Sequence, residues 1–536
     1  MDRREIGILV ATGGIFAVCC FSFFQFLLPY HLFFKEQIQL FLLTAEYFIS
    51  YFEKPAWLAA YSGDFLTQFF YLRGGGATIL TLILLLEWWM VMQVVRTFGL
   101  TNKRIGRIAL LSLIPVLVDG YLHTRLSYPL SMSVSVILVM ALFLLYTRIN
   151  NKWGALVYGI ISLPLLYIIA GVAFFLFPVF VLCYEISRKR IRLLYWLILF
   201  VMAGFFPTIM KQVYLLTTRQ AYRYPLKTLK ISGINFNSEK VLALASESYF
   251  ENWKEVYELA DEFKLSNTLA TYYANIALSR RNELPGRLLE YYQPFSEGLF
   301  LQVGPQSNWI DIFFSSDVFF HVGDMNMAQH SAMLGMIFSP NHRSSRMVKR
   351  LAEINLVNND STATRKYLRM LDATLFHRKW ALEHEKMLTG DIEDYPWLKT
   401  KRSQIPMRDT LRLSSDYPAS LRVLIESNPA DNYALDYLLC FYLLNKNMQS
   451  FSETYDTWYK SKKSRAKLYD EALLIKLAAT KATPKEVASY AIPPDVITDF
   501  TEYTRIYEQS NGDLEQLRER FGSTYWFYFH FARMQK

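Results

Sequence analysis

The stretch "TLILLLEWWMVM" (residues 81–92) lies inside an apolar run at residues 76–98. A helix needs about 20 predominantly apolar residues to cross a bilayer, so this run is long enough for one crossing. It nevertheless carries an acid, Glu87, near its middle. An ionised carboxylate surrounded by lipid costs several kcal/mol. We therefore expect Glu87 to face the interior of a helix bundle.

Six further apolar runs predict additional crossings, at 6–28, 106–122, 130–147, 154–170, 172–187 and 191–211. The continuous run 154–187 is too long for one crossing and contains no polar loop. We divide it near "AGVA" (170–173), because glycine permits a tight turn there. The sequence therefore predicts about seven spans.

The positive charge is concentrated in the apolar half of the chain. Residues 1–230 carry 21 Lys and Arg against 9 Asp and Glu, whereas the remainder carries 36 against 38. This excess is typical of cytoplasmic loops between spans, and the later part has no basic patch suited to nucleic acid. The loop cations are Arg96, Lys103, Arg104, Arg107, Arg148, Lys152, Arg188, Lys189, Arg190 and Arg192. We expect a bacterial inner (plasma) membrane protein with a cytoplasmic N-terminus and a periplasmic C-terminal domain.

The long external loop 29–75 between the first two spans is more than a linker. Its polar positions recur at helical spacing, which predicts one amphipathic helix on the membrane surface; they are Glu36, Gln39, Glu46, Ser50 and Glu53. Gly63-Asp64 predicts a turn and the N-cap of a second helix. Arg73 precedes three glycines at the start of the next span, where backbone amides can bind an anion. Alternatively, the glycines give a flexible start and Arg73 reaches to the membrane interface.

The acids Glu36, Asp64, Glu87 and Asp119 are expected to gather around one external cavity, together with Arg73 and Arg125. The alternatives are that Glu87 is simply protonated or hydrogen-bonded within the helix packing, and that Asp119 pairs with Arg125. No Cys or His spacing in the chain predicts a metal site. No cofactor can be assigned from the sequence.

The C-terminal part is predicted to be soluble and helical. We expect a transmembrane domain at 1–213, a linker at 214–245 and a helical-repeat domain at 246–536. Residues 252–292 resemble a tetratricopeptide-type repeat, and 428–460 is a weaker copy. The fold class is therefore all-α, a multi-span bundle followed by a tetratricopeptide-like solenoid. Such solenoids bind a protein or peptide partner on a concave face.

Two resemblances add to these expectations. Through "HLFFKEQIQLFLLTAEYF" (31–48), "GDFLTQFFY" (63–71) and "TYWFYFHF" (524–531), the whole chain resembles an uncharacterised family of bacterial polytopic membrane proteins. The first 210 residues or so are similar in layout to membrane glycosyltransferases that use polyprenyl-phosphate sugars. That resemblance implies Glu36 as the base, Asp64 as an auxiliary acid, and Arg73 or Arg125 on the donor phosphate. Two features depart from it: the usual acidic pair is absent, and Ala56 replaces a proline.

Three functions follow from these observations. The first is a membrane-bound helical-repeat protein that binds a partner or assists envelope assembly. The second is an envelope enzyme, such as a glycosyltransferase, that acts on a lipid-linked substrate at the external face. The third is a transporter in which Glu87 relays a proton.

Overall fold

The computed structural model describes residues 3–98, 105–188, 193–226, 233–304, 306–340, 342–406, 416–462 and 465–532. All regular structure in these ranges is helical, and none of it is β-strand. The chain divides into two compact units. We call residues 1–239 with 370–379 the apolar unit, and residues 240–369 with 380–536 the C-terminal unit.

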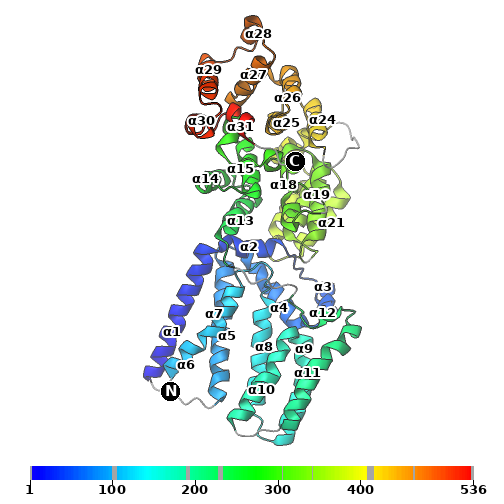
Figure 1. Cartoon of the computed structure of the whole chain (residues 1–536). Coiled ribbons are helices and arrows are strands. Elements are labelled where there is room, and N and C mark those ends of the chain that lie inside the picture. Colours follow the sequence, from blue (N-terminus) through cyan, green and yellow to red (C-terminus); the bar gives the residue numbers. More distant parts are fainter. Residues whose placement is uncertain are drawn as a thin grey trace. The chain divides into compact units, whose positions relative to one another are not determined.

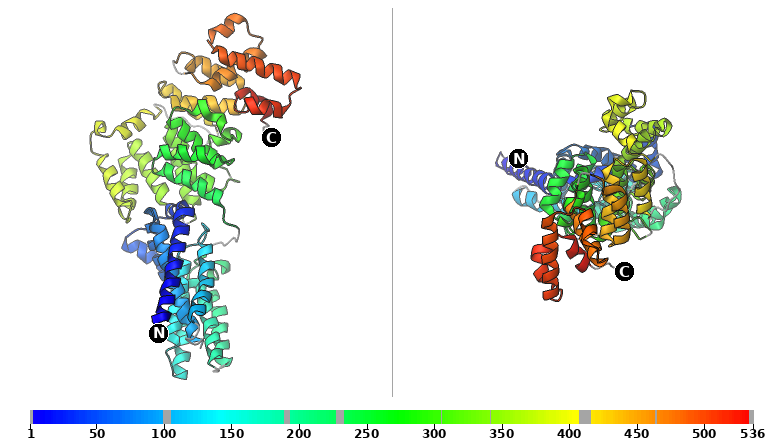
Figure 2. Two further views of the ribbon diagram at one scale, coloured as in Figure 1. Left: turned by 90° about the vertical axis from the view of Figure 1, so that its left-hand side faces the viewer. Right: turned by 90° about the horizontal axis from the view of Figure 1, so that it is seen from above.

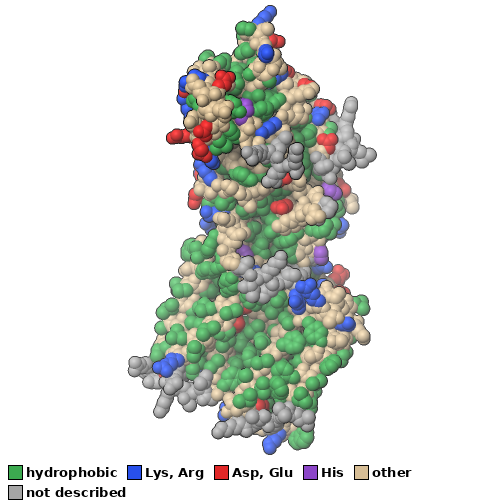
Figure 3. Space-filling view, in the orientation of Figure 1, with side chains coloured by type: hydrophobic (Ala, Val, Ile, Leu, Met, Phe, Trp, Pro, Cys, Tyr) green, Lys and Arg blue, Asp and Glu red, His purple; other side chains and the backbone are tan. Residues whose placement is uncertain are grey.

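Long helices form the body of the apolar unit and run side by side in Figure 1 and in the left view of Figure 2. They are α1 (Arg3–Ser22, extended by a π turn at Phe23–Leu27), α5 (Gly75–Thr97), α8 (Ser131–Tyr146), α9 (Lys152–Ala170), α10 (Leu176–Ser187) and α11 (Leu193–Val213). Large apolar side chains such as Val10, Ile161 and Phe205 are exposed on their outer faces, and Figure 3 shows this surface to be predominantly hydrophobic. Continuous exposed apolar surface of this kind is suited to lipid.

Four helical stretches are long and apolar enough to cross a membrane: Glu5–Leu27, Gly75–Thr97, Lys152–Ser187 and Tyr195–Val213. The seven spans predicted from the sequence are therefore not shown. The expected span 130–147 forms the shorter helix α8, and 106–122 forms two helices, α6 (Ile105–Leu111) and α7 (Leu113–Leu122). Pro115 accounts for this break, because it has no N–H to donate to the carbonyl of Leu111.

The stretch Lys152–Ser187 doubles back on itself. The ring of Tyr146 on α8 lies 6.4 Å from Tyr158 on α9 and 6.1 Å from Tyr184 on α10. A straight helix would separate these two positions by about 39 Å. The reversal falls at Gly171, where φ is +61° and a Cβ would lie 2.4 Å from the carbonyl oxygen of Tyr224. The turn expected at 170–173 is therefore present.

The prediction of a single amphipathic helix in the external loop is wrong. Two helices, α2 (Pro29–Gln37) and α3 (Ala45–Ser50), are separated by a non-helical segment at 38–44. In that segment Leu43 N donates to Ala373 O at 2.7 Å, and Thr44 then caps α3. Glu36 is buried and Glu46 is exposed, so no continuous acidic stripe forms.

Gly63-Asp64 is not a turn but part of helix α4 (Trp57–Thr67), which is followed by a 3-10 turn at Gln68–Tyr71. The glycine is explained by packing: a Cβ on Gly63 would lie 2.5 Å from the backbone nitrogen of Ser131 on α8. Helix α4 begins after Ala56, whose φ is +59°. The remaining helix of this part is α12 (Thr218–Ala221).

The C-terminal unit is built from helical hairpins. The predicted pairs exist as α14 (Trp253–Phe263) with α15 (Thr268–Arg280), and as α25 (Asn432–Leu444) with α26 (Met448–Thr454). After α15 the chain forms only the four-residue helix α16 (Leu284–Arg287), so a regular solenoid is not confirmed. The aromatic end forms helix α31 (Tyr525–Phe531), with Trp526 fully buried.

The other helices of this region are α13 (Phe236–Tyr249), α17 (Trp309–Phe314), α18 (Ser316–Val322), α19 (Met325–Phe338), α20 (Ser345–Val357), α21 (Ser361–Asp372), α22 (Arg378–Lys386), α23 (Pro396–Ser403), α24 (Tyr417–Ser427), α27 (Lys467–Ala479), α28 (Pro484–Ser489), α29 (Pro494–Gln509) and α30 (Leu514–Phe521). Some positions singled out from the sequence lie outside the described residues: Lys103, Arg104, Lys189, Arg190, Arg192 and the part of the expected linker at 227–232.

Candidate functional site: two polar centres in the apolar unit

Glu87 faces the interior, as expected, with 3% of its surface exposed. Its carboxyl group contacts that of Asp119 on α7, which is also buried. One carboxylate oxygen of Glu87, Oε2, has no hydrogen-bond partner among the described residues. Two carboxyl groups in contact repel if both are ionised, so they share a proton or one of them is neutral. Glu87 and Asp119 therefore form one buried acidic pair within the helix bundle.

Asp119 is the centre of a hydrogen-bonded network. Tyr128 donates its hydroxyl hydrogen to Oδ1, and Ser133 donates to Oδ2 at 2.5 Å. His123, one turn further along α7, places Nε2 3.5 Å from Oδ2 and 2.7 Å from the hydroxyl of Ser133. All four side chains are buried. Hydroxyl donors of this kind stabilise the ionised form of a buried carboxylate.

Lys35 on α2 brings a buried cation to this network. Its ammonium group donates to the carbonyl oxygens of His123 at 2.9 Å and Tyr128 at 3.0 Å. Burial lowers the pKa of Lys35 to about 7, although the charge of Asp119 opposes the shift. His31, one turn earlier on α2, lies with Nε2 3.2 Å from the same His123 carbonyl. We call Lys35, His31, Glu87, Asp119, His123, Tyr128 and Ser133 the Asp119 network.

Helix α2 is fixed at its N-terminus by a distant acid. The carboxylate of Glu239 accepts from the backbone N–H groups of Tyr30 at 2.7 Å and His31 at 3.0 Å. The first turn of a helix has unsatisfied N–H groups and a partial positive charge, so a carboxylate there is favourable. Glu239 therefore sets the position from which α2 presents Lys35 and Glu36.

Glu36 forms a second centre with a histidine from far along the chain. Its Oε1 lies 2.9 Å from Nε2 of His377, and both side chains are buried. His377 belongs to the short segment 370–379, which packs within the apolar unit. The ring of Tyr71 lies 4.8 Å from that of His377. Burial, with the nearby Glu36 as a smaller cause, raises the pKa of Tyr71. We call Glu36, His377 and Tyr71 the Glu36 site.

The segment that carries His377 is held by specific contacts. Leu375 N donates to the side-chain oxygen of Gln68 at 3.3 Å, and His377 N donates to the hydroxyl of Thr374 at 3.1 Å. The ring of Phe376 stacks on Tyr71, with centroids 5.9 Å apart. The histidine is therefore delivered to Glu36 by an ordered turn.

The remaining predicted residues are dispersed. Asp64 accepts from the hydroxyl of Tyr51 at 2.8 Å. Arg125 donates to the carbonyl of Gly233 at 2.9 Å and to the hydroxyl of Tyr121 at 2.7 Å, so the expected pairing with Asp119 is wrong. Arg73 is exposed two residues after Tyr71. The structure groups Glu87 with Asp119, but it does not bring all four acids around one cavity.

Sequence reasoning overlooked Lys35, His31 and His377. The first two were detectable, since four residues separate them on a predicted helix and place both on one face. His377 gave no signal, because it is 341 positions from Glu36. Among the described residues, no three His, Cys, Asp or Glu side chains are grouped so as to hold a metal ion.

The chain is a helical, membrane-associated protein. It has apolar helices long enough to cross a membrane, a polar interior and an all-α C-terminal unit. A family model described as "Family of unknown function (DUF6057)" matches residues 5–532, so the chain belongs to that family. This match confirms the resemblance of the whole chain to an uncharacterised family. No curated protein and no solved structure matches the chain.

Proposed function

We propose that the apolar unit crosses the membrane and is a transferase that uses a polyprenyl-phosphate-linked donor at the external face. The observation that carries this proposal is the buried pair between Glu36 and His377, with Oε1 and Nε2 2.9 Å apart. Glu36 lies on α2, the helix that directly follows the first span. A carboxylate held against an imidazole is suited to general acid–base chemistry. The similarity of the first 210 residues to such transferases supports the same role for Glu36.

The polar interior argues against a unit that serves only as an anchor. An anchor needs apolar helices and nothing more, whereas this unit buries Lys35, Glu87 and Asp119. Buried ionisable groups in membrane segments are costly, and they are retained at substrate sites, ion paths and proton relays. The Asp119 network therefore supports a chemical role for the unit.

In the proposed reaction, the Glu36 carboxylate accepts the proton of an acceptor hydroxyl group. The acceptor oxygen then forms a bond to the anomeric carbon of the donor sugar. The bond between that carbon and the phosphate oxygen breaks, and polyprenyl phosphate leaves with the electron pair. His377 acts as a positioning residue for Glu36.

Arg73 is the better candidate of the two predicted phosphate ligands. Both terminal nitrogens of Arg125 already donate to Gly233 and Tyr121. Arg73 is exposed, and it precedes the N-terminus of α5, where Gly74 adopts a φ of +80°. The helix N-terminus and a guanidinium together favour a phosphate.

We further propose that the N-terminus is cytoplasmic and that loop 29–75 and the C-terminal part lie on the external side. Two observations support this: α9 and α10 form a hairpin, and Leu43 of the loop bonds to Ala373 of the later chain. Single cysteines at exposed positions 46 and 394 of a cysteine-free variant should both react with an impermeant maleimide on intact cells. Labelling of only one position contradicts the shared side.

The enzyme proposal is tested with Glu36→Gln, with Glu46→Gln as the matched control because Glu46 is an exposed acid of the same loop. A deletion strain is complemented with each variant, and its envelope glycans are compared by mass spectrometry at equal membrane levels of protein. We expect Glu46→Gln to restore the wild-type pattern and Glu36→Gln to reduce transfer about 100-fold or more. Full restoration by Glu36→Gln would overturn the proposal, and loss only with Glu87→Gln would favour a transporter.

A second function, partner binding, is favoured by one feature of the C-terminal unit. A groove of about 970 Å³ is lined there by apolar and aromatic side chains, among them Trp309, Phe319, Leu334, Tyr417 and Phe441. Grooves of this size bind ligands or apolar peptide side chains. Leu334→Glu should abolish capture of a crosslinked partner in cells, whereas exposed Leu382→Glu should not. Identical crosslinked products from both variants would contradict this function.

A further inference from the structure

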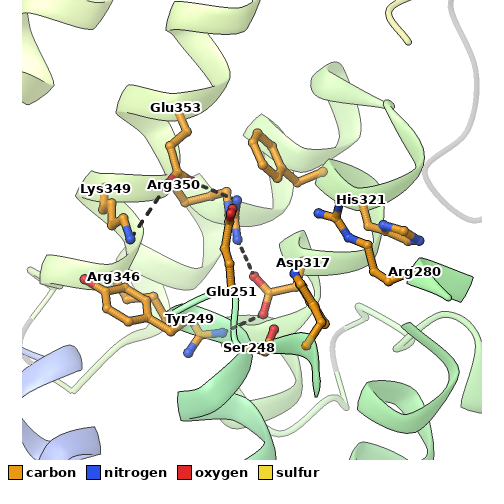
Figure 4. A pocket seen from close by; sticks show the side chains of 12 residues that line it. Ser248, Tyr249, Glu251, Arg280, Asp317, His321, Arg346, Lys349, Arg350 and Glu353 are labelled. Atoms are coloured by element: carbon orange, nitrogen blue, oxygen red, sulfur yellow. Dashed lines mark hydrogen bonds and ion pairs between the residues drawn. The ribbon is translucent and has the colours of Figure 1, made fainter. Parts of the chain in front are cut away.

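A small cationic pocket lies inside the C-terminal unit, away from the groove described above. The centre of a water molecule can occupy about 20 Å³ of it, and it is lined by side chains from α13, α14, α15, α18 and α20. Figure 4 shows Arg280 of α15 and Arg350 of α20 extending toward the same space. The pocket is small, so only a compact ligand group fits.

Most of the charges in this pocket are already neutralised. Asp317 forms ion pairs with Arg346 at 2.6 Å and with Arg350 at 3.1 Å. Arg350 also pairs with Glu353 at 2.8 Å, and Lys349 lies 3.9 Å from the same carboxylate. The positive charges of Arg346, Lys349 and Arg350 are therefore each paired with a carboxylate of the same unit.

Arg280 is the exception. Among the described residues its side chain makes no hydrogen bond and no ion pair, and its Nε, which is shielded from solvent, has no partner. Its guanidinium stacks over the ring of Trp253 at 5.1 Å, which leaves the planar edge free to donate. Burial is the largest cause that lowers its pKa, and the charge of Glu251, which lines the same pocket, opposes the shift.

A second unsatisfied group belongs to His321, which also lines this pocket. His321 is 1% exposed, and its Nδ1 has no hydrogen-bond partner, while Nε2 lies 2.8 Å from the hydroxyl of Ser279. Lys401 adds a further cation next to these groups and donates to the carbonyl oxygens of Phe320 and His321. A half-buried cation without an ion pair and a buried imidazole nitrogen without a hydrogen-bond partner are both unfavourable.

We propose that this pocket binds a compact oxyanion, a phosphate group or a carboxylate, through Arg280 and His321. A guanidinium edge binds both anions with two parallel hydrogen bonds, and an N–H at His321 Nδ1 adds a third donor. The ligand supplies the direct ion pair that no side chain among the described residues makes with Arg280. The site is independent of the transferase proposal.

The test is a titration of the full-length protein in nanodiscs with inorganic phosphate and, separately, with acetate, at constant ionic strength held by chloride. Isothermal titration calorimetry should show saturable binding of at least one anion, with a matching rise in Tm. Arg280→Gln should weaken this binding at least about 10-fold. Arg281→Gln is the control, since that neighbouring arginine pairs with Glu283 outside the pocket, and it should bind like the wild type.

Each outcome decides the proposal. Binding of phosphate only indicates a phosphoryl ligand, binding of acetate only indicates a carboxylate, and both results support the site. Absence of saturable binding to the wild type overturns it, as does wild-type affinity in Arg280→Gln. Without anion, Arg280→Gln should melt at or above the wild-type Tm, because an unpaired cation is removed. If this variant does not fold, Arg280→Lys decides: it should fold and bind at least about 10-fold more weakly, because it lacks the planar fork.

Discussion

Both units bury charged side chains, but they neutralise them differently. In the C-terminal unit, the carboxylate of Asp317 is paired directly with two guanidinium groups, Arg346 and Arg350. In the apolar unit, the ammonium of Lys35 donates to backbone carbonyls, and Asp119 accepts from hydroxyl groups. Direct pairs fix charge in place, whereas hydroxyls and carbonyls leave protons free to redistribute. The first arrangement suits stability and the second suits a proton-handling site.

The largest effect is expected from breaking the direct pairs. Asp317→Asn leaves Arg346 and Arg350 buried without their shared counterion, which typically costs about 3–5 kcal/mol. We expect a marked loss of Tm, measured on the full-length protein by tryptophan fluorescence. Asp394→Asn is the control, because Asp394 is exposed. A Tm for Asp317→Asn equal to that of the control would mean that these ion pairs contribute nothing to the fold.

In contrast, the buried Lys35 of the apolar unit should make the stability of the protein depend on pH. Lys35 has a pKa of about 7 in the folded protein against an ordinary value of 10.5. Between these values the unfolded chain binds more protons, so stability falls as the pH drops from 10 toward 7, by at most about 1.4 kcal/mol per pH unit. Lys35→Met should flatten this dependence, and exposed Lys54→Met should leave it unchanged. The same slope of Tm against pH in wild type and Lys35→Met would contradict the assignment.

Close packing positions these charges in the apolar unit. Gly63→Ala places a Cβ 2.5 Å from the backbone nitrogen of Ser131, so α4 and α8 must separate. We expect a loss of about 1–3 kcal/mol, as for other overpacked sites. Gly204→Ala on α11 is the matched control, since its Cβ meets nothing within 4 Å. That change should stabilise the helix by about 0.5–1 kcal/mol. Tm values of the two variants test the contrast, and an equal Tm for both refutes it.

Some of this architecture could be predicted from the sequence, and the reasons are specific. Glu87 had to face inward because lipid does not solvate a carboxylate, and Gly171 had to mark a turn because 154–187 exceeds one crossing. Both statements depend only on local composition. The partner of Glu36 could not be found this way, because His377 is brought to it by tertiary packing. Gly63 was misread because glycine marks a close backbone approach as well as a turn.

The smallest effect is expected from removing the N-cap of one helix in each unit. Thr483 and Thr217 each form a reciprocal capping box, with Glu486 in the C-terminal unit and Gln220 in the apolar unit. Removing a threonine cap costs about 0.5–2 kcal/mol. Glu486 is charged at the positive end of a helix dipole, and its hydrogen bonds to Thr483 lower its pKa. Thr483→Ala should therefore show a loss that becomes smaller at low pH, when Glu486 is protonated, whereas the loss in Thr217→Ala should not change with pH. Hydrogen exchange of the first turns of α28 and α12 measures both, and equal pH dependence would show that the charge of Glu486 adds nothing to its hydrogen bond.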